Sequence, residues 1–127
     1  MLSLSASSRS FLYRNQADMR KGFDGLCGLV REGLSRDPLS GDVFIFFNRR
    51  CTQVKLLVWE RDGFAIYHKR LEQGTYELPS DQSAELRSEE LMLILQGISL
   101  KSVRRRKRFD ISKNNFDRSE QRSFVNG

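Results

Sequence analysis

Three consecutive apolar segments, separated by short polar turns, constrain the fold of this chain more than any other feature. Residues 42–47 have the sequence Asp-Val-Phe-Ile-Phe-Phe, a continuous run that predicts a central strand buried on both faces. Residues 53–59 and 64–70 predict two further strands, and the Asp-Gly dipeptide at 62–63 is a strong turn signal between them. Strands joined in succession by short loops predict an antiparallel meander.

The turn between the second and third of these strands allows two registers. A two-residue turn at Asp62-Gly63 sets Lys55 opposite Arg70, which places like charges side by side. A four-residue loop over residues 60–63 instead matches apolar partners across the ladder, so the sequence predicts this register. Its cross-strand pairs are Trp59 with Phe64, Leu57 with Ile66, and Leu56 with Tyr67.

A helix is predicted over residues 17–34, where apolar residues recur at the spacing of three and four that marks one buried stripe. Asn15 is the expected N-cap with Asp18 in the first turn, and Pro38 prevents continuation beyond the following loop. The stripe consists of Met19, Phe23, Leu26, Cys27, Val30 and Leu34.

Three glycines, Gly22, Gly25 and Gly28, fall inside this predicted helix. Each costs about 1 kcal/mol relative to alanine, which indicates that another backbone approaches closely. Their spacing is GxxGxxG within a periodic helix, whereas a phosphate-binding fingerprint requires GxGxxG in a turn after a strand. A nucleotide site is therefore not predicted.

The second half of the chain predicts less regular structure. Residues 75–78 are expected to add an edge strand ended by Pro79, and residues 80–87 are expected to form a loop. Ser88 is expected to cap a second short helix that Gly97 ends. The predicted fold class is α+β: an antiparallel meander of three to four strands packed against an N-terminal helix, with a second short helix and a basic, disordered C-terminal tail.

The positive charge of the chain is confined to its C-terminus. Residues 1–100 hold 13 Lys and Arg against 13 Asp and Glu, whereas residues 101–127 hold 9 against 3, which accounts for the whole net charge of +6. We therefore expect an α+β accessory domain over residues 1–100 and a basic tail over 101–127. A neutral body with a cationic arm is typical of a segment that follows phosphate, although a solvated, disordered terminus has the same composition.

Composition excludes several classes of protein. With 39% hydrophobic and 30% charged residues and no apolar run of membrane-spanning length, the chain is expected to be soluble and not to cross a membrane. The first residues lack the features of a secretion signal, so a cytoplasmic location is expected. Cys27 and Cys51 form neither a CxxC pair nor a disulfide framework, and reduced thiols are expected.

Four blocks of sequence carry a resemblance to a known family. In order and spacing they closely resemble the TnpB-type accessory protein, the second-reading-frame product of the insertion-sequence sixty-six family of bacterial mobile elements, which is distinct from the RNA-guided nuclease of the same name. The likeness runs from about Arg9 to Phe109, with Gly22 and Glu60 as mild departures. The blocks are Asp-Met-Arg-Lys-Gly-Phe-Asp-Gly-Leu at 18–26, Asp-Val-Phe-Ile-Phe-Phe-Asn-Arg-Arg at 42–50, Lys-Leu-Leu-Val-Trp-Glu-Arg-Asp-Gly-Phe at 55–64, and Lys-Arg-Leu-Glu-Gln-Gly at 69–74.

The resemblance implies a part in DNA transposition. In that family the strand-transfer chemistry is assigned to a separate, larger transposase with an acidic catalytic triad, and the small protein is needed for efficient movement of the element. The resemblance therefore implies an accessory protein that is not itself an enzyme, with the larger transposase as a partner.

Two groups of cations are candidates for contact with DNA. The first is a run of six within eight residues, followed by Phe109, and arginine forks in such an arm suit phosphate oxygens. The second group lies at the predicted hairpin ends, where Glu60, Asp62 and Glu72 are close enough in sequence to neutralise it. The first group is Lys101, Arg104, Arg105, Arg106, Lys107 and Arg108, and the second is Arg49, Arg50, Lys55, Arg61, Lys69 and Arg70.

No catalytic residue, metal ligand or cofactor site is predicted. The acidic residues Asp24, Asp42, Asp62 and Glu77 lie in cap, turn and edge contexts and do not converge as a metal-dependent nuclease requires. His68 has no second histidine or cysteine at ligand spacing and is expected to be a half-exposed sheet residue. Trp59 and Tyr67 suit base stacking, but cross-strand packing is the favoured interpretation.

Two functional hypotheses follow. In the first, the chain binds DNA without catalysis, through residues 101–108 with help from Arg49 and Arg50, and assists the transposase at the element's ends or on nonspecific duplex. In the second, it is an adaptor that binds the transposase through the sheet or the first helix, without specific DNA contact. Both leave a homo-oligomer open.

Overall fold

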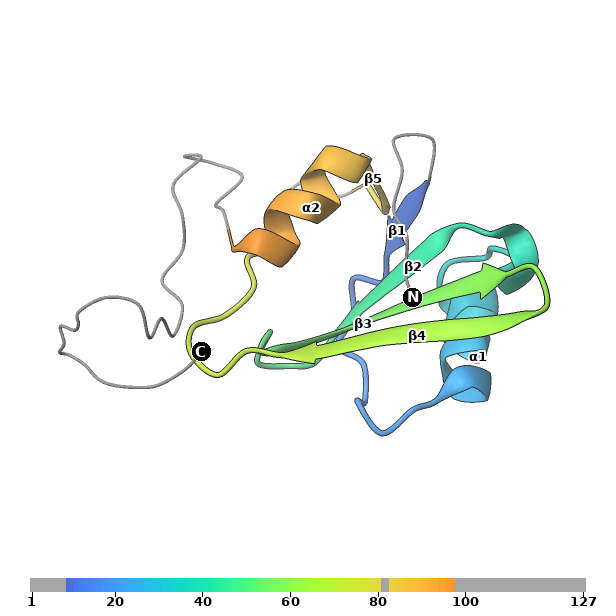
Figure 1. Cartoon of the computed structure of the whole chain (residues 1–127), viewed down its shortest axis with the longest axis horizontal. Helices are drawn as coiled ribbons and strands as arrows, with labels where there is room; N and C mark the ends of the chain where they lie inside the picture. Colours follow the sequence, from blue (N-terminus) through green and yellow to red (C-terminus); the bar gives the residue numbers. More distant parts are fainter. Residues whose placement is uncertain (1–8, 81–82, 98–127) are drawn as a thin grey trace, which may run out of the picture.

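A five-stranded sheet with one helix on each face forms the protein (Figure 1). The structure is a computed structural model that describes residues 9–80 and 83–97. The elements in chain order are β1 (Ser10–Leu12), α1 (Phe23–Gly33), η1 (Pro38–Ser40), β2 (Val43–Phe47), β3 (Gln53–Glu60), β4 (Gly63–Arg70), β5 (Glu85–Leu86) and α2 (Ser88–Gln96). The predicted α+β class is confirmed.

The strand order in the sheet is β4-β3-β2-β1-β5. Strands β2, β3 and β4 form the predicted antiparallel meander, and the pairs Trp59 with Phe64 and Leu56 with Tyr67 confirm the predicted register. Glu60 pairs with Gly63, so the loop that links the strands in this register is shorter than the four residues expected. The sequence did not predict β1, which runs parallel to β2 and antiparallel to β5.

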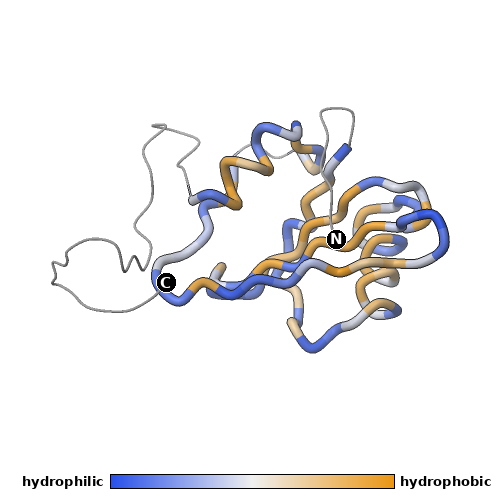
Figure 2. The backbone as a smooth tube through the Cα atoms, viewed as in Figure 1, coloured by the Kyte–Doolittle hydropathy of each residue, from blue (hydrophilic) through white to orange (hydrophobic). Residues whose placement is uncertain are grey.

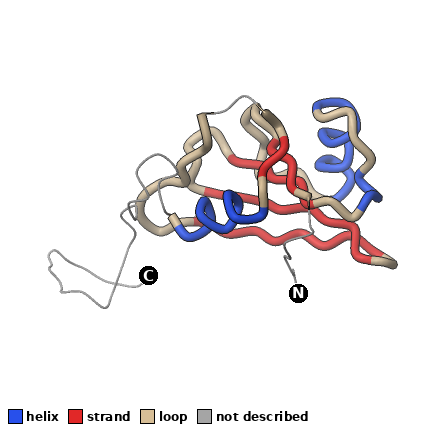
Figure 3. Tube along the Cα trace, turned by 90° about the horizontal axis from the view of Figure 1, so that it is seen from above, coloured by secondary structure: helices blue, strands red, loops and turns tan. Residues whose placement is uncertain are grey.

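The hydrophobic core has two layers, one on each face of the sheet. Alternate residues of β2 point to opposite faces: Phe44 and Phe46 pack with α1, whereas Val43 and Ile45 pack with α2. All five residues of β2 are buried, as the continuous apolar run predicted. Figure 2 shows the apolar residues concentrated along the central strands, and Figure 3 shows the two helices over different parts of the sheet.

The first helix is shorter than the periodicity predicted. It begins at Phe23, and the residues before it run beside β2, where the Ala17 N–H donates to the Phe47 carbonyl at 2.9 Å. Asn15 therefore caps no helix, and because the N-cap position is Gly22, the helix begins without a side-chain cap. Ala17 is buried in the α1-facing layer and Met19 is partly buried against it, so their spacing imitates one more helical turn.

The expectation that glycines in this region meet another backbone is wrong. A Cβ on Gly22 or Gly28 would have nothing within 4 Å, and one on Gly25 would meet only the side chain of Lys21. The close approach occurs instead at Gly33, where a Cβ would lie 2.5 Å from Cε1 of Tyr13. The Tyr13 ring in turn packs against Phe46 with a centroid separation of 5.6 Å, so it is not free to move away.

The predicted edge strand at residues 75–78 is also wrong. This segment forms no strand, although Tyr76 is buried and its N–H donates to the Cys51 carbonyl at 2.7 Å. Within the expected loop at residues 80–87, β5 pairs with β1 at the far edge of the sheet. The second helix ends as predicted at Gly97, which adopts a φ of 79°, but its N-cap is Arg87, whose N–H donates to the Glu90 carboxylate.

The space around two glycines of α1 predicts that substitution by alanine changes the free energy of unfolding in opposite directions. Gly28→Ala gains helix propensity at a position with free space and is expected to raise the free energy of unfolding by about 0.5–1 kcal/mol. Gly33→Ala places its Cβ against the Tyr13 ring and is expected to lower it. Denaturant unfolding of both variants tests this contrast, and equal stabilisation by both would contradict the packing described for Tyr13.

Candidate nucleic-acid interface

The turn between β2 and β3 presents two arginines to solvent. The Asn48 side chain organises this turn, because its Oδ1 accepts hydrogen bonds from the N–H groups of Thr52 and Gln53, both at 2.9 Å. Its Nδ2 also donates to the Thr52 hydroxyl at 3.0 Å. Arg49 and Arg50 are exposed between these anchoring points. A rigid turn therefore holds both guanidinium groups outward at one end of the sheet.

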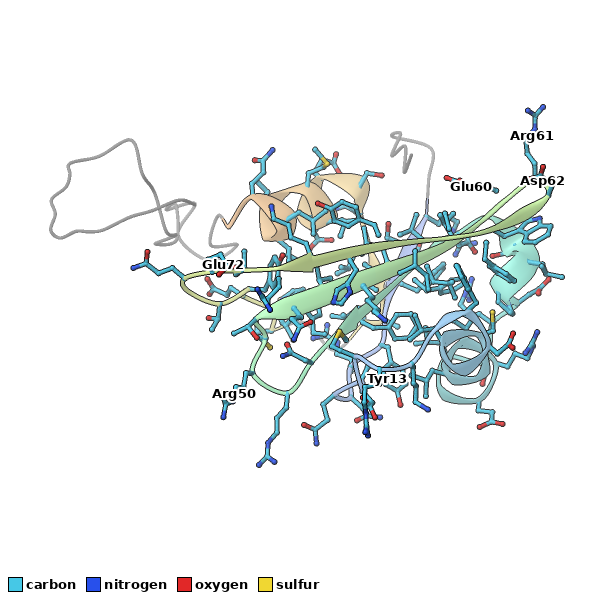
Figure 4. All side chains as sticks on the ribbon, turned by 60° about the horizontal axis from the view of Figure 1, so that its bottom comes forward. Tyr13, Arg50, Glu60, Arg61, Asp62 and Glu72 are labelled. Atoms are coloured by element: carbon cyan, nitrogen blue, oxygen red, sulfur yellow. The ribbon has the colours of Figure 1, made fainter. Side chains whose placement is uncertain are left out.

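The C-terminal end of β4 adds two further cations beside this turn. The N–H of Leu71, which follows β4, donates to the Thr52 carbonyl at 2.8 Å and joins the two segments. Lys69 pairs with Val54 of the α2-facing layer, and side chains alternate along a strand, so Arg70 points to the opposite face. We call Arg49, Arg50, Lys69 and Arg70 the basic end; Figure 4 labels Arg50 at this end of the sheet.

The charges of the basic end are mostly uncompensated. Arg70 forms an ion pair with Glu72 at 3.3 Å, and both side chains are largely exposed. Among residues 9–80 and 83–97, the ion pairs involve Arg9, Arg20, Arg70 and Arg87, and none involves the other three cations of the basic end. His68 adds little charge at neutral pH, because partial desolvation and then the cations Lys55 and Arg70 lower its pKa.

Lys55 does not belong to this surface, although the sequence grouped it with the other cations. Its side chain is only 8% exposed, and its Nζ donates to the Lys21 carbonyl at 2.7 Å. This bond fastens the turn before α1 to the underlying face of β3. Lys55 is buried because side chains alternate along β3 and its own points to the face that α1 covers. It lies there between its cross-strand partners Phe46 and His68.

The six cations of the C-terminal arm, Lys101 to Arg108, lie outside the described residues. The described chain ends at Gly97, directly after α2, and Figure 1 shows this end of α2 above the end of the sheet where β4 finishes. Lys101 follows Gly97 by four residues, so the length of the chain limits the separation of their Cα atoms to about 14 Å.

The turn that precedes α1 contains a local ion pair. The Arg20 guanidinium donates to both carboxylate oxygens of Asp18, with Nη2 2.8 Å from Oδ2, and the Arg20 N–H donates to Oδ1 at 2.9 Å. The Lys21 N–H closes the turn onto the Asp18 carbonyl at 3.0 Å. Arg20 is therefore neutralised by its neighbour and is a weak candidate for phosphate contact.

Trp59 and His68, which were considered from the sequence as candidate site residues, make contacts within the sheet. Trp59 packs edge-on against Phe64 across the β3–β4 ladder, with centroids 5.0 Å apart. His68 is exposed on β4 with its Nε2 2.8 Å from Oε1 of Gln53. The described part of the chain contains no group of three potential metal ligands, and none of its helices combines the length and apolarity of a membrane span.

Sequence reasoning missed the part of Asn48 in presenting the arginines. A signal for it was available, because asparagine side chains commonly bond to backbone N–H groups within turns, and Asn48 directly precedes Arg49. Parts of all four resembling blocks lie near this end of the sheet. The second block ends in the Asn48 turn and the fourth begins at Lys69. Lys55 of the third block bonds to the carbonyl of Lys21 in the first.

The ion pair in the turn before α1 predicts a measurable titration. The hydrogen bonds from Arg20 lower the pKa of Asp18 to about 2, so the ionised carboxylate favours the fold above its unfolded pKa and this contribution is lost as the pH falls through about 2. Arg20→Ala is expected to raise the pKa of Asp18 toward its ordinary range, about 3.9. Carboxyl NMR titration measures this shift, with Arg31→Ala on exposed α1 surface as the control. An unchanged pKa in Arg20→Ala would contradict the pair.

Comparison with known proteins identifies the family. The model of the IS66 Orf2 like protein family matches residues 8–105, which include all four blocks. Two proteins of Sinorhizobium fredii, named "Uncharacterized protein y4jC" and "Uncharacterized protein y4hO", are 31% identical over 84% of this chain and 92% of the relative, and 30% identical over 77% and 87%. No solved structure matches significantly. The chain therefore belongs to the IS66 Orf2-like family, and its role is an accessory one in the transposition of an insertion sequence.

Proposed function

We propose that this protein assists transposition by binding duplex DNA without catalysis, through the basic end of its sheet together with the arm at residues 101–108. The larger transposase of the same element is the partner that it assists. The cations that carry the proposal come from separate parts of the chain: the β2–β3 turn, the end of β4, and the sequence after α2.

The observation that carries the proposal is the direction of α2. The C-terminal end of α2 lies toward the end of the sheet where β4 finishes and where Figure 4 labels Arg50, whereas Glu60, Arg61 and Asp62 lie at the opposite end (Figures 1 and 4). Because the arm follows α2 directly in the chain, we propose that its six cations act together with the uncompensated positive charge at this end of the body. An arm attached at the hairpin tip would instead begin beside two carboxylates.

The contacts proposed here are to phosphate, and phosphate contacts carry no direct information about base sequence. Each neutralised phosphate releases condensed counterions, so binding is expected to weaken steeply with salt and to depend little on sequence. The described residues of the basic end lie in a turn and at the end of a strand, so they present no helix for insertion into the major groove. Placement at the ends of the element is accordingly assigned to the transposase in this proposal, with the accessory protein adding nonspecific affinity.

The salt dependence of DNA binding tests this proposal. Association constants for a duplex carrying the element end and for an unrelated duplex, measured across a salt series, are expected to be similar and to fall together. Arg105→Ala with Arg106→Ala is expected to reduce the slope of log K against log salt by about 2, and Arg49→Ala with Arg50→Ala by up to the same amount.

Arg31→Ala with Arg61→Ala is the matched control, because it removes the same charge from α1 and from the opposite hairpin tip. This pair is expected to leave the slope nearly unchanged. No measurable affinity at low salt would reject the proposal. Equal effects of the three pairs would show that net charge alone, and not the basic end, governs binding.

A pull-down of the transposase with and without DNA distinguishes this proposal from the adaptor hypothesis. If the two proteins associate only when DNA is present, a shared duplex joins them, as proposed. If they associate in nuclease-treated samples and the basic-end variants associate equally well, the protein is an adaptor and the proposed DNA contact is not its means of assistance.

A further inference from the structure

The outer edge of β4 is the longest unpaired strand edge in the described part of the chain. Strand β4 spans Gly63–Arg70 and pairs only with β3, because it is the last strand of the sheet on that side. The opposite edge is formed by β5, which has two residues and leads directly into α2. One edge of the sheet is therefore short, whereas the other presents eight residues (Figure 1).

The hydrogen-bonding groups on this edge can be assigned from the ladder. The Leu71 N–H bonds inward to Thr52, and inward and outward groups alternate along an antiparallel strand. The N–H and carbonyl groups of residues 64, 66, 68 and 70 therefore point away from β3. They form a row of donors and acceptors that another strand can pair with.

The side chains along β4 divide this edge into two halves. Lys69 and Arg70 make one half basic, and such charges oppose the addition of a strand that lacks complementary charge. Residues 63–67, with the sequence Gly-Phe-Ala-Ile-Tyr, carry no charge, and Tyr67 is 39% exposed. The half next to the hairpin thus lacks the usual protection and has acidic residues just beyond it, at Glu60 and Asp62.

We propose that this edge pairs with the same edge of a second copy of the chain, antiparallel, to form a continuous ten-stranded sheet. The charges support a second copy as the occupant, because β4 is basic at one end and is preceded by carboxylates at the other. An antiparallel copy reverses this order and places unlike charges together at both ends of the interface. The body over residues 1–100 is neutral overall, so no net charge of the folded part opposes the approach.

The charges also select the register. Pairing centred on Ile66 sets Asp62 of each copy opposite Arg70 of the other and matches the outward groups of Phe64 with those of His68. A register shifted by one pair toward the hairpin sets Arg61 opposite Lys69, and one shifted toward the basic end sets Asp62 opposite Glu72. Glu60 is not part of this edge, because it belongs to β3 and pairs with Gly63. Along the edge itself, each shift creates a like-charge pair that the Ile66 register avoids, so the Ile66 register is favoured.

Charge reversal tests this register. We expect the full-length protein to be dimeric by light scattering or sedimentation, and Asp62→Arg or Arg70→Asp to weaken the dimer by about tenfold, since each change occurs twice across the symmetric interface. The double variant Asp62→Arg with Arg70→Asp is expected to restore the dimer. Glu32→Arg, an exposed charge reversal on α1, is the control and is expected to leave the dissociation constant unchanged.

Two results would overturn the proposal. The first is a protein that stays monomeric at all accessible concentrations, which would leave the edge to a strand of a different protein. The second is a dimer that weakens with the single variants but does not recover in the double variant. These measurements contain no DNA, so they can reject the proposed dimer without rejecting the proposed DNA binding. Equally, the salt series can reject DNA binding without rejecting the dimer.

Amide hydrogen exchange locates the interface independently of any substitution. The N–H groups of Phe64, Ile66 and His68 are expected to become more protected as the protein concentration rises, because they point to the free edge. Those of Ala65 and Tyr67 bond to β3 and are expected to be protected throughout. Protection that does not depend on concentration at the three outward positions would place any dimer contact elsewhere and overturn the proposal.

Discussion

The burial of β2 on both faces is the constraint on which the rest of the structure depends. A strand whose five side chains are all buried requires apolar cover above and below and a hydrogen-bonded neighbour on each side. Helix α1 covers Phe44 and Phe46, and α2 lies on the layer of Val43 and Ile45. Strand β3 satisfies one edge and β1 the other. Two helices and two strands thus complete the surroundings of one short segment.

The sequence revealed the parts of this arrangement that local signals determine. The register of the β3–β4 hairpin followed from matched pairs such as Trp59 with Phe64, and Gly97 marked the end of α2 because glycine readily adopts a positive φ. It did not reveal β1 or β5, because strands of three and two residues carry almost no periodicity and exist only through pairing with distant segments. The same cause explains the overlong first helix, since Ala17 is held by the Phe47 carbonyl.

The candidate interface was predicted unevenly for a related reason. Arg49 and Arg50 follow directly from the sequence because they lie in a turn, where side chains point to solvent almost regardless of the fold. Lys55 lies on a strand, and its exposure depends on which face a helix covers, which composition does not reveal. Its ammonium group is buried and bonded to the Lys21 carbonyl, so a cation counted toward charge is in fact part of the packing.

The position of β1 inside the sheet has a consequence for the order in which the protein can fold. β1 is the first element of the described residues, yet it lies between β2 and β5 in the sheet. Arg9, just before it, forms an ion pair with Glu85, 76 residues later. During synthesis the meander of β2, β3 and β4 is complete by Arg70, while one edge of β1 lacks its partner until β5 has left the ribosome. Contacts at such long sequence separation slow folding. Closure of the sheet is therefore a late event in biogenesis, and the N-terminal strand has one open edge until then.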